Sequence, residues 1–200
     1  MKNIIQMVVV LTVLSGSSAG ILAAIRVMTM DKIEYQQLKF QKEPAVRKIM
    51  EGSAVDPMAG RFKVDYQGRK LTIFPGEIDG ERMAAFETFG KGYSGEVGVM
   101  VGLSLSSGRI IGMGVTTHSE TPGIGSKAKD SSTFVDQFEG EPVESGFKVR
   151  NDGGGVDAIS GATITSRAVC VAVDEAGKVY GDLKEKLLAT ETEAKDGNNG

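Results

Sequence analysis

The sequence predicts an α+β protein with an N-terminal transmembrane helix, followed by an antiparallel sheet and flanking helices. Residues 4–25 carry neither charge nor proline, and residues 61–117 contain short strand-like runs separated by turns. Residues 169–187 carry apolar side chains at helical spacing. Glycine accounts for 27 of the 200 residues and is concentrated between positions 76 and 161, which is typical of a turn-rich body rather than of a helical bundle. Consecutive strands with helices before and after them indicate the α+β class.

The N-terminal segment is the first element, and it determines the compartment. At about 1.5 Å per residue, residues 4–25 cover the roughly 30 Å hydrocarbon core of a bilayer. Two interpretations remain: a cleaved signal peptide with Ser17-Ser18-Ala19 at the cleavage site, or an uncleaved anchor formed by residues 1–29. The anchor is favoured because the apolar pattern resumes after Gly20 and completes a full span. Lys2 argues for a cytoplasmic N-terminus, and Arg26 and Lys32 on the other side weaken this bias. We expect a single-pass protein of the inner (cytoplasmic) membrane with an extracytoplasmic body.

Residues 30–60 are expected to form a stalk helix and a linker. From Met30 to Met50, apolar residues are interleaved with Lys and Glu at helical spacing, and Pro44 is expected to break this helix. Residues 52–60 resemble a loop.

The body is expected to span residues 61–189, and its first half contains the strand signals. A turn at Gln67-Gly68 joins the first two runs, and Ser106-Ser107-Gly108 joins the last two in the clearest hairpin of the chain. The expected strands are 62–66, 71–74, 83–89, 95–105 and 109–117.

The second half of the body is expected to be less regular before a final helix. Residues 118–129 resemble a polar loop, and residues 147–150 resemble a further strand. The C-terminal helix has Thr165 or Ser166 as its natural N-cap. Residues 190–200 are polar and are expected to be a disordered tail.

Composition narrows the function. The net charge is −3 and there is no basic block, which argues against a nucleic-acid partner. Cys170 and His118 are the only cysteine and histidine, so this chain alone provides neither an Fe–S cluster nor a multi-histidine metal site. Cys170 is expected to be a small packed side chain. Electron transfer by this chain would therefore need an organic cofactor.

One segment, residues 157–166, carries the strongest chemical signal: Asp-Ala-Ile-Ser-Gly-Ala-Thr-Ile-Thr-Ser. Gly161 allows a sharp bend, Ala162 adds little bulk, and the following helix offers free N–H groups and a positive dipole end to a phosphate. The alternative is an ordinary strand-to-helix turn in which the hydroxyl residues act only as caps.

A second segment gives the first one its context. Residues 118–125 read His-Ser-Glu-Thr-Pro-Gly-Ile-Gly, and they are accompanied by Gly92-Tyr93-Ser94-Gly95 and by residues 134–140, which end in Gln-Phe-Glu-Gly. Together with the N-terminal anchor, these pieces resemble, in order over most of residues 1–189, the G subunit of the Rnf electron transport complex. The related C subunit of the Na⁺-pumping NADH:quinone reductase, from the same FMN-binding domain family, is similar.

This resemblance implies a covalent flavin. In the family, a flavin transferase uses FAD as donor and joins FMN through a phosphoester to the motif threonine, which is Thr163 here. The resemblance implies that the transferase recognises Asp157, Ser160, Gly161, Ala162 and Thr163. It also implies cofactor-binding candidates at Ser160, Gly161, Ala162, Thr165, His118, Glu120, Thr121, Pro122, Gly123 and Ile124. For His118, a proton-coupling role competes with that of a loop residue with structural hydrogen bonds.

The resemblance implies an electron carrier. The sequence offers no obvious pair of a base and a nucleophile, so we expect no substrate turnover by this chain itself. The expected function is reversible reduction of FMN, in one-electron steps, within an ion-translocating ferredoxin:NAD⁺ oxidoreductase. The expected partners are the membrane redox and Fe–S subunits of the complex, a flavin transferase and the membrane. The alternatives are the corresponding quinone reductase component, an anchored scaffold domain without a cofactor, and a flavin-carrying domain of an extracytoplasmic reductase.

Overall fold

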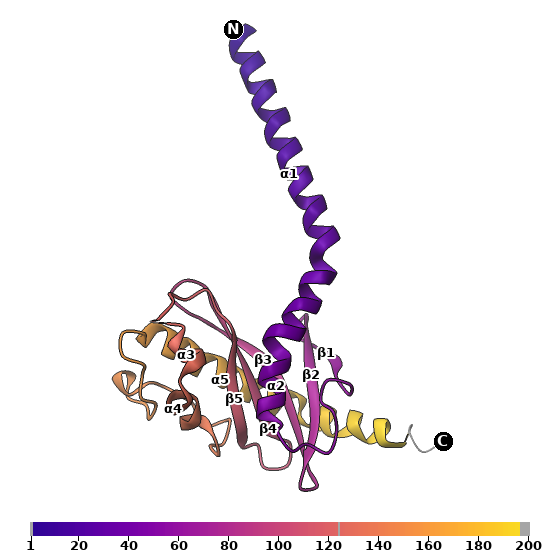
Figure 1. Cartoon of the computed structure of the whole chain (residues 1–200), viewed down its shortest axis with the longest axis vertical. Helices are drawn as coiled ribbons and strands as arrows, with labels where there is room; N and C mark the ends of the chain where they lie inside the picture. The colour runs from indigo at the N-terminus through magenta and orange to yellow at the C-terminus, as the bar shows by residue number, and fades with distance from the viewer. Residues whose placement is uncertain (1, 124, 197–200) are drawn as a thin grey trace. The chain divides into compact units, whose positions relative to one another are not determined.

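The structure, a computed structural model, describes residues 2–123 and 125–196 and divides into two compact units, residues 1–40 and 41–200. The first unit is built on the apolar helix α1 (Lys2–Gln37) (Figure 1). Within the described part of the chain, the only helix long and apolar enough to cross a membrane is Asn3–Met30. This helix indicates a single-pass membrane anchor.

The expected break in the stalk lies at a short π-helix, η1 (Leu38–Lys42), directly before α2 (Glu43–Ile49). Pro44 lies in the first turn of α2. A proline is tolerated there because its missing N–H has no partner within the helix. The helical backbone is therefore continuous past Pro44, and the break expected there is only a change from π-helix to α-helix.

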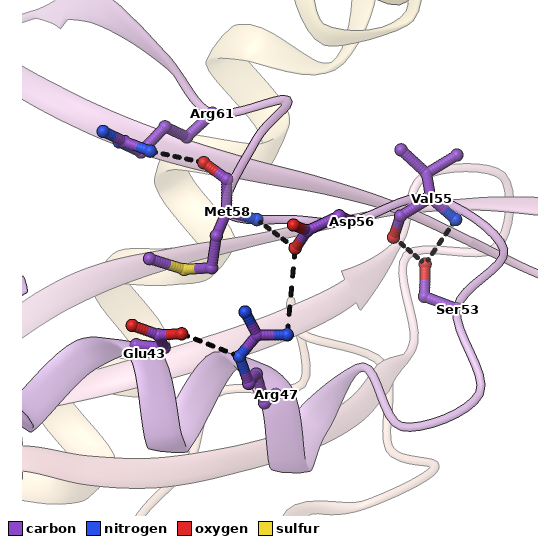
Figure 2. A network of polar contacts seen from close by, with 7 residues as sticks. All are labelled: Glu43, Arg47, Ser53, Val55, Asp56, Met58 and Arg61. Atoms are coloured by element: carbon purple, nitrogen blue, oxygen red, sulfur yellow. Dashed lines mark hydrogen bonds and ion pairs between the residues drawn. The ribbon is translucent and has the colours of Figure 1, made fainter. Parts of the chain in front are cut away.

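The segment after α2 is held by polar contacts, as Figure 2 shows. Arg47 reaches Glu43 at 2.8 Å and Asp56 at 3.9 Å, and the same Asp56 carboxylate accepts a hydrogen bond from the Met58 amide. Arg61 donates to the Met58 carbonyl. The loop expected at residues 52–60 is therefore an ordered linker that leads into the sheet.

Five strands form one antiparallel sheet in the order β1-β2-β3-β4-β5, so each strand pairs with its neighbour in the chain. The turn between the first two strands has positive φ at Gln67 (52°) and Gly68 (76°), as two-residue hairpins require. The α+β class is confirmed. The strands are β1 (Phe62–Tyr66), β2 (Arg69–Ile78), β3 (Glu81–Lys91), β4 (Glu96–Ser104) and β5 (Ile110–Thr117).

The two faces of this sheet carry different helices (Figure 1). The long helix α5 (Thr163–Asp196) packs on one face and forms the main core with the sheet. It approaches β3 so closely that a Cβ at Gly90 would lie well inside 3.0 Å of the Ala168 carbonyl. On the other face, α2 packs over β4 and β5, where Gly114 would bring a Cβ to 3.6 Å of Ala45.

A partly buried ion pair lies on the α2 face, with the Lys42 side chain 26% exposed. Glu87 of β3 is buried and contacts Lys42 Nζ at 2.8 Å. The Thr116 hydroxyl of β5 donates to the same carboxylate. A buried carboxylate is tolerated when it is paired and hydrogen-bonded in this way.

The region between β5 and α5 departs from the expectations. Residues 147–150 are not a strand: a single bridge joins Val149 to Val156, and η3 (Arg150–Asp152) follows. Phe147 and Val149 are both buried, so these two alternating side chains fix a loop to the core rather than forming part of a strand. Three short helices complete this region: α3 (Lys127–Asp130), α4 (Ser132–Val135) and η2 (Asp136–Phe138).

The boundaries of α5 also differ from the expectations. It begins at Thr163, so Thr165 and Ser166 lie within its first turn and the N-cap assignment was wrong. Its helical backbone continues to Asp196, past residue 190 where a disordered tail was expected. Residues 197–200 lie outside the described part.

Candidate functional site

Three segments far apart in the sequence meet at the side chain of Glu120. They are the turn between β3 and β4 (residues 92–95), the loop after β5 (residues 118–125), and the first turn of α5. Glu120 Oε1 accepts a hydrogen bond from the Ser94 amide at 2.9 Å, and Oε2 accepts one from the Thr165 hydroxyl at 2.7 Å. The fold therefore brings together the motifs that the sequence singled out.

The glycines in these motifs leave room for this carboxylate. A Cβ at Gly92 would lie 2.6 Å from Glu120 Oε1, and a Cβ at Gly125 would lie 2.6 Å from Glu120 Cβ. Real Cβ atoms do not come this close, so any other residue at either position would displace the Glu120 side chain or a loop.

Glu120 is held in its charged form. It is only 6% exposed, and this burial alone raises its pKa. Hydrogen bonds from the Ser94 amide, the Thr165 hydroxyl and the Tyr93 amide, with the charge of His118, outweigh the burial, so the net pKa is lowered from 4.5. The carboxylate is therefore ionised at neutral pH.

The first turn of α5 places two threonines in different environments. Successive helical residues differ by about 100°, so Thr163 and Thr165 point about 200° apart. Thr165 is 2% exposed and faces Glu120, whereas Thr163 is half-buried. Within residues 2–123 and 125–196, the Thr163 hydroxyl makes no hydrogen bond. Ser166 is engaged with the backbone: its hydroxyl accepts from the Ile159 amide and donates to the Ala162 carbonyl, both at 3.0 Å.

The turn before α5 has the geometry expected from its sequence. Gly161 has a φ of +78°, a left-handed conformation that favours glycine, and the turn is closed by a 2.9 Å hydrogen bond from the Ala162 amide to the Ile159 carbonyl. Ser160 and Gly161 are exposed and Ala162 is buried. Thr163 thus stands at the positive end of the α5 dipole, directly behind an exposed turn.

The other end of the motif is held by Gln137, to which the sequence interpretation assigned no role. Its side-chain amide brackets the backbone of Asp157: Oε1 accepts from the Asp157 amide at 2.7 Å, and Nε2 donates to the Asp157 carbonyl at 3.3 Å. The Asp157 carboxylate is exposed and pairs with Arg150 at 2.7 Å. The signal for Gln137 was present in the Gln-Phe-Glu-Gly piece of residues 134–140.

The remaining candidates differ in exposure. Thr121, Pro122 and Gly123 are exposed, while Ile124 lies outside the described residues. His118 is half-buried, and its Nδ1 is buried without a hydrogen-bond partner in the described structure. A buried nitrogen of this kind is suited to a partner supplied by a bound group.

Two apolar side chains beside the site were missed by the sequence interpretation. Tyr93 is 74% exposed in the turn whose next residue contacts Glu120, and Ile164 is 45% exposed next to Thr163. The only sequence signal was their position inside the two motifs. A free hydroxyl at a helix N-terminus, an orphaned imidazole nitrogen and exposed apolar side chains fit a flavin phosphate with its ring nearby.

Comparison with known proteins decides the family. Residues 92–178 match the family described as FMN-binding domain, which implies FMN as the cofactor. Over 190 residues, the chain is 32% identical to the G subunit of the ion-translocating oxidoreductase complex of Vibrio cholerae serotype O1 (strain M66-2), covering 89% of this chain and 90% of that protein. The chain belongs to the family of G subunits of ion-translocating oxidoreductase complexes. The Rnf resemblance is therefore confirmed.

Other G subunits align over a shorter stretch. The G subunit of Pseudomonas aeruginosa (strain UCBPP-PA14) is 40% identical over 108 residues, which covers 52% of this chain and 50% of that protein. The chain thus spans about half the length of this relative. The crystal structure of Shewanella oneidensis NqrC shares the fold of this chain, with a TM-score of 0.51 and 22% identity over 70% of this chain and 74% of that one.

Proposed function

We propose that this chain is a membrane-anchored flavoprotein subunit that relays electrons in an ion-translocating ferredoxin:NAD⁺ oxidoreductase, with FMN bonded to Thr163. The observation that carries the proposal is the state of three neighbouring hydroxyls. Thr165 and Ser166 are buried and hydrogen-bonded, whereas Thr163 is half-exposed with its hydroxyl unengaged in the described structure. Of these three, Thr163 is the hydroxyl that another enzyme can reach.

The attachment is a phosphoryl-group transfer with FAD as donor, catalysed by a separate flavin transferase. Thr163 Oγ1 forms a bond to the flavin-side phosphorus, the pyrophosphate P–O bond breaks, AMP leaves, and the hydroxyl proton passes to the solvent. The exposed turn at Ser160 and Gly161 gives a bulky donor access. The α5 N-terminus favours the negative phosphate of the product.

When bound, FMN supplies reversible uptake and release of electrons. Around it, the chain offers groups for three tasks. Thr121, Pro122 and Gly123 are exposed residues that could contact the ring, and Tyr93 and Ile164 offer exposed apolar surface against which it could pack. The orphaned Nδ1 of His118 can hold a proton or accept a hydrogen bond.

The match to an FMN-binding domain argues against the scaffold without a cofactor. The similarity to the Vibrio cholerae G subunit favours the ferredoxin:NAD⁺ oxidoreductase over the quinone reductase. We infer that the partners are the membrane redox and Fe–S subunits, and that the body is extracytoplasmic with the N-terminus in the cytoplasm. Co-purification of this chain with a six-span redox subunit and an Fe–S subunit would support its membership of the oxidoreductase complex. Digestion of the body by protease in right-side-out vesicles but not in inverted ones would support an extracytoplasmic body. The opposite pattern would reject it.

Covalent attachment is tested by coexpressing the full chain with a flavin transferase and viewing a denaturing gel under ultraviolet light. The wild-type band should fluoresce and Thr163→Val should be dark, because valine has no oxygen to bond. Thr163→Ser is the matched control and should remain fluorescent. Peptide mass spectrometry should place the FMN mass on Thr163. A dark wild-type band, or FMN on Thr165, rejects the proposal.

A further inference from the structure

Glu120 is bound on both of its carboxylate oxygens by segments other than its own. We propose that Glu120 and Thr165 form a positioning pair that fixes the first turn of α5 for flavin transfer to Thr163. Glu120 then acts through the protein rather than on the flavin ring. This inference rests on the proposed function, and it adds a role for two residues that never touch the reacting atoms.

The contacts show why this pair determines the position of the turn. The hydrogen bond to Thr165 Oγ1 joins residues 45 positions apart in the sequence, and the one to the Ser94 amide joins residues 26 apart. A carboxylate that accepts from two different elements holds both in one arrangement, and charged hydrogen bonds are stronger than neutral ones.

The side chains of the pair are buried and tightly packed. Glu120 is 6% and Thr165 2% exposed. A Cβ at Gly125 would lie 2.9 Å from Glu120 Oε2 and 3.1 Å from Thr165 Oγ1, so the loop backbone closes directly over the hydrogen bond. Without the Thr165 hydroxyl, Oε2 would be a buried charged atom without its donor. The loop or the helix start would then have to shift to admit a water molecule.

The consequence for Thr163 follows from the helix. Thr163 and Thr165 belong to the same first turn, so a displacement of Thr165 moves the Thr163 hydroxyl with it. A misplacement of about 1 Å can slow a positioned group transfer about a hundredfold. We therefore expect loss of the Thr165 hydroxyl to slow flavin attachment at least about tenfold.

The experiment uses the full chain, purified in detergent without flavin and incubated with flavin transferase and FAD. The rate of in-gel fluorescence is measured for wild type, Thr165→Val and Glu120→Gln. Both variants should be labelled at least about tenfold more slowly than wild type. The matched control is Thr88→Val: Thr88 is 4% exposed, and its hydroxyl donates to the Ala172 carbonyl of α5 at 2.7 Å, away from the first turn. It should lose a similar buried hydrogen bond and keep the wild-type rate.

A second pair of variants isolates the hydroxyl. Thr165→Ser and Thr165→Ala both lose the methyl group, and only serine keeps the oxygen. Serine should retain at least about a third of the wild-type rate, while alanine should be as slow as valine. If the Thr165→Val variant does not fold, the comparison of Thr165→Ser with Thr165→Ala tests the proposal instead. Hydrogen exchange of the flavin-free chain should become faster in residues 92–95 and 118–123 for Thr165→Ala, and not for Thr88→Val.

The outcomes separate the two proposals. Labelling of Thr165→Val or Thr165→Ala at the wild-type rate overturns the positioning role and leaves the covalent flavin intact. Equal slowing in Thr88→Val also overturns it, because general loss of stability would then explain the effect. A wild-type chain that is not labelled at all removes the proposed function, and the positioning role with it.

Discussion

The close approach of α5 to β3 at Gly90 predicts that Gly90→Ala disrupts the body of the protein. A Cβ at this position would strike the carbonyl oxygen, carbonyl carbon and Cα of Ala168, all backbone atoms of α5. No flexible side chain is available to move aside. The helix itself must shift away from the sheet, and the core residues between them must repack.

The size of the effect follows from what has to move. Overpacking a core costs about 1–3 kcal/mol and occasionally more, and a clash with helix backbone belongs at or above the upper end. We expect a loss of about 3–4 kcal/mol in the free energy of unfolding. For a protein of this size, this lowers the melting temperature by about 6–16 °C. Because Thr163 lies only five residues before Ala168, flavin attachment should also slow.

The assay is thermal unfolding of the full chain in detergent, followed by near-ultraviolet circular dichroism. This signal reports the packing of aromatic side chains, which here include four tyrosines and no tryptophan, and it does not report the backbone helicity of α1. Gly114→Ala is the control: its Cβ would meet Ala45 at 3.6 Å, an ordinary contact. Alanine in a strand should there be neutral or stabilising by up to about 1 kcal/mol. Melting of Gly90→Ala within about 2 °C of wild type would refute the packing argument.

Three further predictions concern other contacts. Lys42→Met should lower the free energy of unfolding by about 3 kcal/mol, because it leaves the Glu87 carboxylate buried without its ion pair. In urea unfolding, the double variant Lys42→Met/Glu87→Met should recover most of this loss. Additive losses would contradict a coupled pair. Gln137→Leu should lower the free energy of unfolding by about 1–2 kcal/mol and slow flavin labelling, because the Asp157 backbone loses both of its hydrogen bonds to the Gln137 side chain. An unchanged labelling time course would contradict a role for Gln137 in holding the segment for labelling. Cys170 is 2% exposed, and burial, followed by the charge of Asp174, raises its pKa to about 12, so a maleimide at pH 8 should label it only after unfolding, as read by intact mass.

The sheet was largely predictable because its signals are local. Alternating side chains and the Gln67-Gly68 and Ser106-Ser107-Gly108 turns located five strands. The second strand was expected to end at Phe74, yet β2 continues through Pro75 to Ile78. Pairing with β1 ends at Ile73, so at Pro75 only β3 lies alongside and the missing N–H leaves no gap in a second ladder. This depends on the length of a neighbouring strand, which periodicity alone does not reveal.

The site was predictable in its parts and not in its connections. The turn at Gly161 was predictable because a turn glycine is a local property, whereas Thr163 was named through the family resemblance and the start of the helix was placed too late in the chain. The contact between Glu120 and Thr165 depends on how three loops converge, and nothing in either motif states that the two side chains meet. Both residues were assigned to the flavin through the family resemblance, which does not reveal this contact.

The position at which α5 begins determines which partner each hydroxyl of the motif can reach. A helix that began with Thr165 as its cap would direct that hydroxyl to the backbone amides of the first turn. Glu120 would then lose a donor inside a buried site, at a cost of about 1–3 kcal/mol. Starting at Thr163 instead gives two hydroxyls separate partners: Thr165 binds Glu120, and Ser166 binds the backbone of Ile159 and Ala162. Thr163 is left half-buried on the other side of the helix. The buried carboxylate therefore favours the helix start that leaves the Thr163 hydroxyl accessible, so the proposed positioning pair and the proposed attachment position both follow from where α5 begins.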